Sequence, residues 1–472
     1  WVEVEPMRGL DAKFLYSETP TAHMHTLKVA VFDTAAAPGG VSVDQVRALL
    51  GRRLDRLPPL RRRAVPVPLG LGHPVWVEDP DFDLDRHVSS RRVAPPGGDR
   101  ELAAVVAEVA GRPLRRDRPL WEVVVVEGLA GDRMAVVAKV HHAVADGAAS
   151  VALLLQALGA PPPAEGGPHP EALPGRAALL RSALAGHRAR LGHLPGLAVR
   201  SVAGLREAAR RRRRAPVRPP LPLQAPRTPF NVSLGAARTF AMTTVALDDL
   251  KEVRRAFDAT VNDVFLAMCA GALRSVLLES GALPGRPLVA SVPLSTGPDA
   301  GRRGGNHVDN LYVSIATDVA DPVARLRHIS AVATSAKEMR GALGTELLED
   351  RAEVVPPQLY ALTIRAWTRS RLAGHVRPPV NVVLSNVPGP AERLRVGPVT
   401  LEALYSVGPI LEGIGVNVTA WSYAGRLFVS VLGSPESLPD PWPLADALPA
   451  ALEELVRRAR QRVAGRPVVA AP

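Results

Sequence analysis

The chain of 472 residues contains a single cysteine, Cys269, and this scarcity excludes an internal disulfide. A lone thiol fits a reducing cytoplasm, and no cysteine–histidine spacing typical of a zinc site occurs, so no metal centre is expected. No basic segment followed by an apolar one stands at the start, and no apolar run is expected to be long enough to cross a bilayer. These features favour a cytoplasmic protein.

Lysine is scarce as well, with five residues among the 58 basic ones. The formal net charge is +12, and it is spread unevenly. Residues 161–227 hold 13 arginines and three acidic residues, so this segment alone carries an excess of 10 positive charges. The rest of the chain is close to neutral. The basic character therefore belongs to this segment, and its abundance of proline and glycine marks it as a connector.

The length is too great for one ordinary domain and suits two domains of about 200 residues each plus a connector. With 47% hydrophobic residues, a sizeable core is available. The predicted division is a first domain at residues 1–160, the connector at 161–227 and a second domain at 228–472.

The connector contains two stretches with helical spacing, at 176–194 and 197–214, separated by Pro195. In the first, leucines gather near one side and arginines occupy the others, and the second ends in an arginine run at 210–214. A basic amphipathic helix of this kind predicts contact with an anionic membrane surface. Nucleic acid is a weaker alternative, because no aromatic residues interleave with the arginines. A merely solvated linker is the third interpretation.

Residues 136–147 are the stretch around which the rest is organised: a strand that ends in a tight turn. Side chains alternate between the two faces of a strand, so small apolar residues and a histidine share one face. These residues are Val136, Ala138, Val140 and His142. Lys139 and His141 face the other way, Asp146 follows four residues after His142, and Gly147 suits a turn that needs a positive φ.

A histidine at such a strand end can act as a base, and a hydroxyl is a poor nucleophile until a base accepts its proton. With an ordinary pKa near about 6.5, His142 can accept this proton and later release it to the leaving group. Asp146 is expected to hold the turn and not to transfer protons. Two adjacent histidines also arise from packing alone, and the complete pattern with Asp146 and Gly147 favours catalysis over that alternative.

Two further strands are predicted beside the histidine strand. Residues 118–127 should pair with it in a hairpin through the turn at 128–132. Trp121 in this strand either lines an acyl channel or fills the core. Residues 24–32 form an apolar strand with His25 at its entrance, where His25 is either a second polar group facing the active centre or a histidine satisfied at the strand edge.

Helices are predicted at 42–54, 101–111, 148–158, 247–257, 260–274, 321–343 and 442–464. Strands of the second domain are predicted at 238–247, 287–295, 311–316, 380–390, 403–410, 413–420 and 426–432. Asn262 and Asp263 lie in the first turn of the helix at 260–274, where capping is the simplest role. The glycine-rich loop at 296–305 lacks the lysine and the spacing of a phosphate-binding loop.

Several separate stretches together carry a resemblance to a known family. They are Pro119-Leu-Trp121, the His-His-x-x-x-Asp-Gly pattern at 141–147, Val261-Asn-Asp263, Gly305-Asn306 and Ser385-Asn-Val-Pro-Gly-Pro390. In this order they resemble the bacterial bifunctional wax ester synthase/diacylglycerol acyltransferase family, within the CoA-dependent acyltransferase superfamily. The likeness runs from Pro6 to the end and is weakest in the connector.

The resemblance implies an α/β (α+β) fold of two chloramphenicol-acetyltransferase-like domains, each a mixed sheet with helices, meeting at a tunnel. His142 would be the general base, and His141, Asp146 and Gly147 would shape its loop. The residues implied to border the substrates are Trp121, Asn262, Asp263, Asn306, Ser385 and Asn386. No cofactor is implied: acyl-CoA is a substrate, and diacylglycerol or a long-chain alcohol is the acceptor. The sequence departs from the family in the short basic loop at 297–304 and in the connector.

The leading hypothesis is therefore an acyltransferase that forms triacylglycerol or wax ester at the inner face of the membrane or on lipid droplets, without nucleic acid. A second hypothesis keeps the chemistry and changes the donor to another acyl carrier or the acceptor to another alcohol. A linked carrier domain would favour it, and none is recognised in this sequence. A third hypothesis, a non-catalytic lipid-binding or droplet-coating protein, is disfavoured by the intact His142, Asp146 and Gly147.

Overall fold

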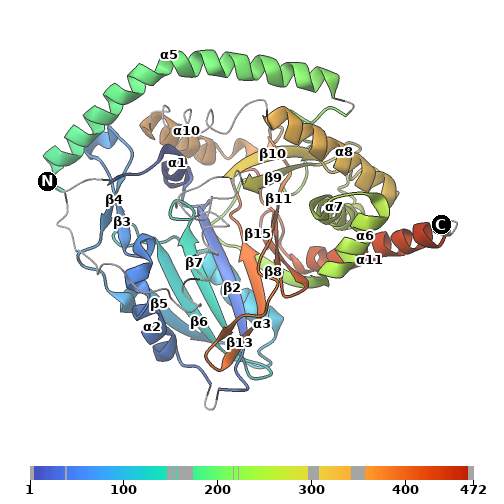
Figure 1. The fold of residues 1–472 in the computed structure, drawn as a ribbon, viewed down its shortest axis with the longest axis horizontal. Coiled ribbons are helices and arrows are strands. Elements are labelled where there is room, and N and C mark those ends of the chain that lie inside the picture. Colours follow the sequence, from blue (N-terminus) through green and yellow to red (C-terminus); the bar gives the residue numbers. More distant parts are fainter. Residues whose placement is uncertain are drawn as a thin grey trace, which may run out of the picture.

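The computed structural model describes residues 5–37, 40–145, 153, 156, 174–215, 217–221, 223–295, 308–341 and 357–465. Within these residues two six-stranded sheets form the centre of the molecule, and helices surround them (Figure 1). Buried aliphatic side chains of both sheets and of their covering helices make up the core. The helix predicted at 148–158 lies outside the described residues, apart from residues 153 and 156.

The first sheet has the strand order β12-β13-β2-β7-β6-β5. Its strands are β2 (His25–Asp33), β5 (Val88–Arg92), β6 (Trp121–Leu129), β7 (Arg133–His141), β12 (Arg395–Val396) and β13 (Val399–Val407). β6 and β7 form the predicted hairpin, and Gly128 and Asp132 in its turn adopt positive φ. β2 pairs with β7 antiparallel and places His25 directly opposite His141.

The second sheet has the order β10-β9-β11-β14-β15-β8. Its strands are β8 (Thr239–Ala246), β9 (Val289–Ser295), β10 (Val308–Ser314), β11 (Val382–Val387), β14 (Asn417–Tyr423) and β15 (Arg426–Gly433). β11 runs parallel to β9 and β14, whereas the other pairs are antiparallel. In the first sheet β5 and β6 are likewise parallel, so both sheets are mixed, as the resemblance implies.

The chain does not divide between the two sheets as the sequence suggests. β12 and β13 lie in the second half of the sequence, yet β13 pairs with β2 in the first sheet. Residues 395–407, which belong to the predicted second domain, therefore complete the sheet of the first one. β13 also contacts β14 and β15, so this crossover ties the two sheets together.

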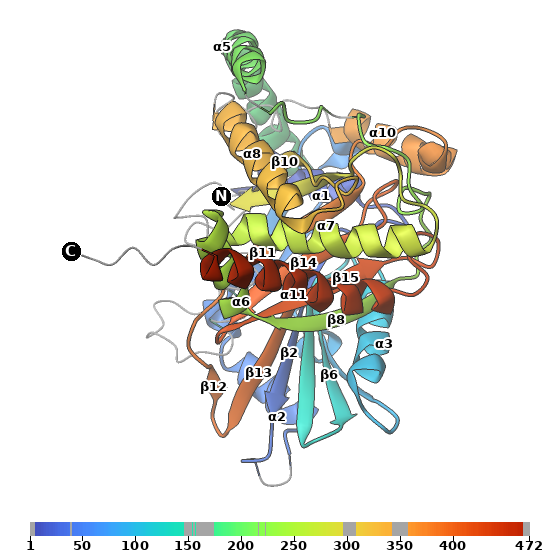
Figure 2. The ribbon, with the colours of Figure 1, turned by 90° about the vertical axis from the view of Figure 1, so that its right-hand side faces the viewer.

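Six helices lie close to the positions predicted from periodicity: α2 (Val43–Gly51), α3 (Asp99–Ala110), α6 (Leu247–Phe257), α7 (Val261–Glu279), α8 (Pro322–Gly341) and α11 (Trp442–Ala464). Ser42 caps α2, since its hydroxyl accepts the Gln45 N–H and the Gln45 side chain accepts the Ser42 N–H. Figure 2 shows α7 and α11 side by side across the second sheet, and α3 beside the strands of the first.

Helix α7 differs from the expectation that no run is long and apolar enough to cross a bilayer. Among the described residues it is the one helix that meets these criteria of length and composition. However, 61% of its most apolar window is buried inside the protein, and it contacts α6, α8 and α11. The high apolar content of α7 therefore fits the core helix of the second half of the chain.

The connector forms one helix, α5 (Arg176–Arg214), where two were predicted. Proline removes one backbone donor, and here the helix continues through Pro195. Both ends of α5 are held: Leu179 and Ala183 pack against Val67, Val75 and Val77, and the Arg211 guanidinium donates to the Glu338 carbonyl of α8 at 2.9 Å. These contacts anchor the single helix near both of its ends.

Several short elements complete the described structure. A small sheet contains β1 (Glu5–Pro6), β3 (Arg62–Val65) and β4 (Val75–Glu78). The helices not predicted from the sequence are α1 (Gly9–Ser17) and α10 (Pro357–Ser370). The 3-10 helices are η1 (Leu54–Arg56), η2 (Pro58–Leu60), η3 (Pro68–Gly70), η4 (Leu84–Arg86) and η5 (Leu372–Gly374).

Candidate active site

His142 is the first residue after β7, and two contacts, one of its backbone and one of its ring, define its place. Its backbone N–H donates to the Met24 carbonyl at 2.7 Å, which extends the pairing of β7 with the segment before β2 by one residue. Its ring stacks on Phe14 of α1, with the ring centroids 4.1 Å apart and the planes inclined by 16°. The imidazole is therefore oriented by an aromatic face and remains partly exposed to a cavity.

This cavity has a volume of about 250 Å³ and lies where the two sheets meet. Besides His142, Phe14 and Met24, its lining comes from β2, β9, β10, β11, β13 and β14 and from the residues that follow β11 and β13. Ser385 and Asn386 of β11, both predicted as site residues, are part of this lining. The structure thus brings together two sequence motifs separated by more than two hundred residues.

Polar side chains of the second sheet face the same cavity and were missed by the sequence analysis. They are Ser291, Asn310, Asn417 and Thr419. The Ser291 hydroxyl donates to Asn310 Oδ1 at 3.2 Å, and the Thr419 hydroxyl donates to Asn417 Oδ1 at 2.7 Å. Fixed amide and hydroxyl groups of this kind can stabilise developing charge on a carbonyl oxygen. Asn417 and Thr419 alternate along β14, but no local pattern shows that they meet Ser291 and Asn310 of β9 and β10.

His141 lies on the opposite face of β7 from His142, as the alternation predicts, and is fully buried. Its Nδ1 accepts the backbone N–H of Ala143 at 3.0 Å, so its Nε2 carries the proton and donates to Glu18 Oε2 at 2.9 Å. Burial lowers the pKa of His141 to about 4, although the bond to Glu18 acts in the other direction. The ring is neutral at pH 7 and holds the turn that follows His142.

Glu18 was missed by the sequence analysis, although it is the central group of this buried cluster. Burial raises the pKa of its carboxyl group. The hydrogen bond from His141 and the charge of Arg116 together lower that pKa by a larger amount, so it lies below the ordinary value. Arg116 forms an ion pair with the same carboxylate. Glu18 is therefore a charged anchor that connects His141 with the segment before β6.

His25 lies behind the site with His141 and does not line the cavity of His142. Its Nε2 lies 3.8 Å from Glu18 Oε1, and neither ring nitrogen has a hydrogen-bond partner among the described residues. Burial lowers the pKa of His25 well below its ordinary value, and the positive charge of Lys139 lowers it further. Neither of the two roles predicted for His25 describes this buried, neutral ring.

Glu18, His25 and His141 also present possible metal ligands within 4.8 Å of one another. Two of the three are already bound to each other, because His141 donates its proton to the Glu18 carboxylate. The Arg116 guanidinium places a fixed positive charge on that carboxylate and opposes a second cation there. The geometry therefore fits a hydrogen-bonded network better than a metal centre.

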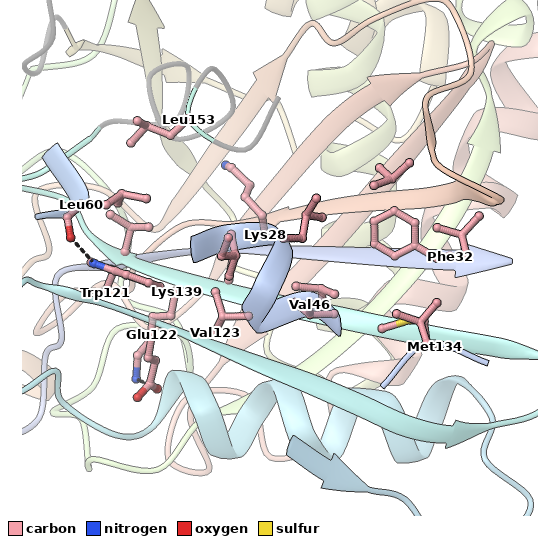
Figure 3. A pocket seen from close by; sticks show the side chains of 18 of the residues that line it. Lys28, Phe32, Val46, Leu60, Trp121, Glu122, Val123, Met134, Lys139 and Leu153 are labelled. Carbon is pink, nitrogen blue, oxygen red and sulfur yellow. Dashed lines mark hydrogen bonds and ion pairs between the residues drawn. The ribbon is translucent and has the colours of Figure 1, made fainter. Parts of the chain in front are cut away.

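Trp121 is buried at the start of β6, and its Nε1–H donates to the Leu60 carbonyl at 2.7 Å. One face stacks on His87, with the ring centroids 4.4 Å apart. Trp121 does not line the cavity of His142 but lines a second, apolar cavity beside it (Figure 3). The structure therefore places Trp121 in a channel wall as well as in the core.

The remaining predicted site residues lie elsewhere. Asp263 is buried in the first turn of α7, where its carboxylate accepts the Thr260 N–H at 3.0 Å and the Ser330 hydroxyl at 3.1 Å. Neither Asp263 nor its neighbour Asn262 lines the cavity of His142, so the structure favours the capping role. Asp146, Gly147 and Asn306 lie outside the described residues.

Comparisons with known proteins identify relatives over nearly the whole chain. The family model described as the wax ester synthase/diacylglycerol acyltransferase catalytic domain matches residues 7–265, and that of the WS/DGAT C-terminal domain matches residues 304–456. A Mycobacterium tuberculosis protein named diacylglycerol O-acyltransferase is 40% identical over 454 residues, which cover 96% of each chain. Another of that name is 38% identical over 462 residues, covering 97% of this chain and 91% of the relative.

Solved structures agree with these matches. The wax ester synthase/diacylglycerol acyltransferase from Marinobacter aquaeolei superimposes with a TM-score of 0.65 and 27% identity, covering 96% of this chain and 100% of that chain. The first condensation domain of the CDA synthetase has a TM-score of 0.56 at 16% identity, covering 98% of this chain and 97% of that one. The second likeness is one of fold.

Proposed function

The chain belongs to the wax ester synthase/diacylglycerol acyltransferase family, and on that premise we propose that acyl-CoA is its donor and a lipid alcohol its acceptor. The family predicted from the sequence motifs is confirmed, and with it the activity: the protein is an acyltransferase of triacylglycerol or wax ester synthesis. The acceptors proposed are diacylglycerol and long-chain alcohols. The observation that carries the proposal is the position of His142 in a cavity lined by both sheets.

The proposed reaction is a direct transfer within this cavity. His142 removes the proton of the acceptor hydroxyl as its oxygen attacks the thioester carbonyl, and a tetrahedral intermediate forms. The intermediate collapses as the carbon–sulfur bond breaks, and the leaving thiolate takes the proton from His142. The ester and free CoA are the products, and His142 is neutral again. The cavity amides and hydroxyls are proposed to stabilise the oxyanion.

The adjacent histidines have separate roles in this proposal. His141 is fully buried, and both of its ring nitrogens already have hydrogen-bond partners, so it is not placed to accept a substrate proton. Its bond to the Ala143 N–H fixes the chain directly after His142. His141 is therefore proposed as a positioning residue and His142 as the general base.

The test is a product assay with purified protein. Radiolabelled acyl-CoA is offered with diacylglycerol and with a long-chain alcohol in parallel reactions, and the lipid products are separated. The expected result is labelled triacylglycerol, wax ester or both, formed together with free CoA. Release of labelled fatty acid alone, with neither ester formed, would overturn the proposed reaction.

The protein is also proposed to attach peripherally to the cytoplasmic face of a membrane or to a lipid droplet, because its substrates reside there. Figures 1 and 2 both place α5 and α10 at the same end of the molecule. Leu359 and Leu362 of α10 and Leu69 of η3 are exposed, and Gln358 of α10 donates to the Leu69 carbonyl. Helix α5 itself carries exposed arginines together with exposed apolar residues such as Leu184 and Leu205. Exposed apolar side chains on an arginine-rich helix fit an anionic lipid surface.

A further inference from the structure

A second cavity, with a volume of about 120 Å³, lies between the first sheet and helix α2. Its walls are formed by side chains of β2, β6, β7 and α2, with Leu60, Leu153, Val396 and Val399 completing them (Figure 3). The accessible surface inside it belongs to apolar atoms. We call this cavity the apolar slot.

The apolar slot begins beside the active-site cavity. Thr26 of β2 lines both cavities, and it pairs directly with Val140, which pairs in turn with Trp121. Val140 and His142 point to the same face of β7, two residues apart. The sheet face on which His142 lies is therefore the same face that lines the slot.

Charged side chains that border the slot direct their polar ends away from it. Lys139 pairs with Glu122 at 2.7 Å, and its ammonium group also donates to the Val109 carbonyl at 2.8 Å. The ammonium group of Lys28 donates to Ser406 at 2.5 Å, so its stem lines the slot and its charge lies towards the active-site cavity. The interior of the slot thus accepts a hydrocarbon.

The far end of the slot is marked by a cross-strand pair. Phe32 of β2 and Met134 of β7 stand directly opposite each other, and both line the slot with Val399. From Val140 to Met134 the strand advances by six residues, about 20 Å at about 3.3 Å per residue. The lining of the slot therefore extends along the sheet over a distance comparable with the length of an extended fatty chain.

We propose that the apolar slot binds the fatty acyl chain of the donor and that Phe32 and Met134 set its maximum length. This inference rests on the proposed function, because it assigns the donor of that reaction to one of two cavities. A single unbranched acyl chain suits the slot, whereas diacylglycerol carries two chains and branches beside its hydroxyl. The larger, partly polar active-site cavity is left for the acceptor.

The test measures kcat/KM for acyl-CoAs from octanoyl to octadecanoyl with one acceptor held constant. Val136 lines the middle of the slot, so Val136→Phe shortens it by about 7 Å relative to Met134. It should lower the preference for hexadecanoyl-CoA over octanoyl-CoA by about tenfold or more, because several methylenes lose their burial. Met134→Ala should shift the optimum to longer chains. An unchanged profile in folded Val136→Phe overturns the inference.

A matched control is Met242→Ala, since Met242 is a buried methionine of the same core cluster that does not line the slot. Its acyl-length profile should equal that of the wild type. A second series varies the length of the alcohol at constant acyl-CoA. If Val136→Phe changes the alcohol profile and leaves the acyl profile unaltered, the slot holds the acceptor chain and the assignment is overturned.

A binding measurement separates this inference from the proposed function. Brominated fatty acids quench tryptophan fluorescence on contact, and Trp121 lines the slot. Quenching should be strong in the wild type and largely lost in Trp121→Phe, and Val136→Phe should weaken binding of long probes by about tenfold. If these binding results are obtained while no acyl-CoA is converted, the slot is supported as an acyl-chain site and the proposed reaction is refuted. Quenching that Val136→Phe leaves unchanged refutes the slot whatever the activity.

Discussion

Among the single residues of the site, Glu18 gives His141 a positioning role that is distinct from the role of His142 as the base. Its carboxylate holds the proton-bearing Nε2 of His141, and this leaves His141 Nδ1 free to accept the Ala143 N–H. The chain directly after His142 is thereby fixed from behind the sheet. A charged partner that orients a neighbouring ring acts on catalysis through geometry and not through contact with substrate.

Replacing Glu18 with glutamine tests this positioning role. Glu18→Gln removes the charge that pairs with Arg116 and should lower kcat by roughly tenfold to a hundredfold, with little change in KM, because His142 loses its alignment. Steady-state kinetics and thermal unfolding provide the measurement. The control is Glu402→Gln, at an exposed glutamate of β13. Wild-type kcat in a folded Glu18→Gln enzyme would contradict the role.

The buried histidines also predict a dependence of stability on pH. Burial lowers the pKa of His141 from 6.5 to about 4 and that of His25 well below 6.5, so both stay neutral while the unfolded chain takes up protons. Stability is therefore full above pH 6.5 and falls as the pH drops towards 4. Each such histidine contributes a slope of at most roughly 1.4 kcal/mol per pH unit.

Melting temperatures between about pH 7 and about pH 5 measure this slope. His141→Gln should flatten it, whereas His375→Gln, at an exposed histidine, should retain the wild-type slope. An equal slope in all three proteins would show that His141 is not the group responsible.

The sequence predicted the two faces of β7 but not the partner of His141. Alternation alone places His142 towards a cavity and His141 behind it, and the structure agrees. Glu18 is separated from His141 by 123 residues, and no local pattern indicates that they meet. For the same reason the polar side chains of β9 and β14 in the cavity could not be assigned before the two sheets were placed together.

Among the secondary-structure elements, α7 begins with a motif of the family resemblance that has a structural role here. Val261-Asn-Asp263 contributes to the family resemblance, yet Asp263 caps the helix with Thr260 and binds Ser330 of α8. A cap that also accepts a bond from a second helix fixes both the start of α7 and its packing. The motif therefore stabilises the start of α7 and its packing against α8.

Asp263→Ala should reduce the free energy of unfolding by about 1–2 kcal/mol, because the first turn of α7 loses its acceptor. The Michaelis constants for acyl-CoA and acceptor should remain at wild-type values. Chemical denaturation and steady-state kinetics measure the two effects, and Thr260→Ala, which removes the other half of the cap, should behave in the same way. A large rise in KM without a loss of stability would show that Asp263 contacts a substrate and would contradict the capping role.

Elements with strong periodicity were predicted within a few residues, whereas those set by distant contacts were not. The bounds of α6 match the prediction, because its apolar spacing is regular and Asp258 ends it in the left-handed conformation. α5 was predicted as two helices, since the contacts that anchor its two ends are not visible in its own sequence. The pairing of β13 with β2 of the first sheet was missed for the same reason, because it depends on a strand far away in the sequence.

At the scale of the whole molecule, the surface at the end formed by α5 and α10 predicts binding to anionic vesicles. Arg210, Arg213 and Arg214 are exposed; Arg211 is exposed as well, but it and Arg212 donate to the Glu338 and Pro219 carbonyls. Replacing Arg210, Arg213 and Arg214 with serine should weaken vesicle binding, most clearly at low salt, since each contributes roughly 1 kcal/mol near such a surface. Activity on detergent-dispersed acceptor should persist.

The matched control removes the same charge from another side of the molecule, by replacing Arg86, Arg91 and Arg92 with serine. All three are exposed at the edge of the first sheet, around β5. Vesicle sedimentation over a range of salt concentrations measures both variants. Equal binding by the two variants at every salt concentration would show that the arginines of α5 are only a solvated face.

His142, held where the two sheets meet, is proposed as the base for acyl transfer. The most direct test is the rate of ester formation by His142→Ala, with the fold verified by its melting temperature and His375→Ala as the control for loss of a histidine. For His142→Ala we expect a fall in kcat of about a hundredfold or more, and for the control wild-type turnover. A folded His142→Ala enzyme that retains most of its turnover would contradict it.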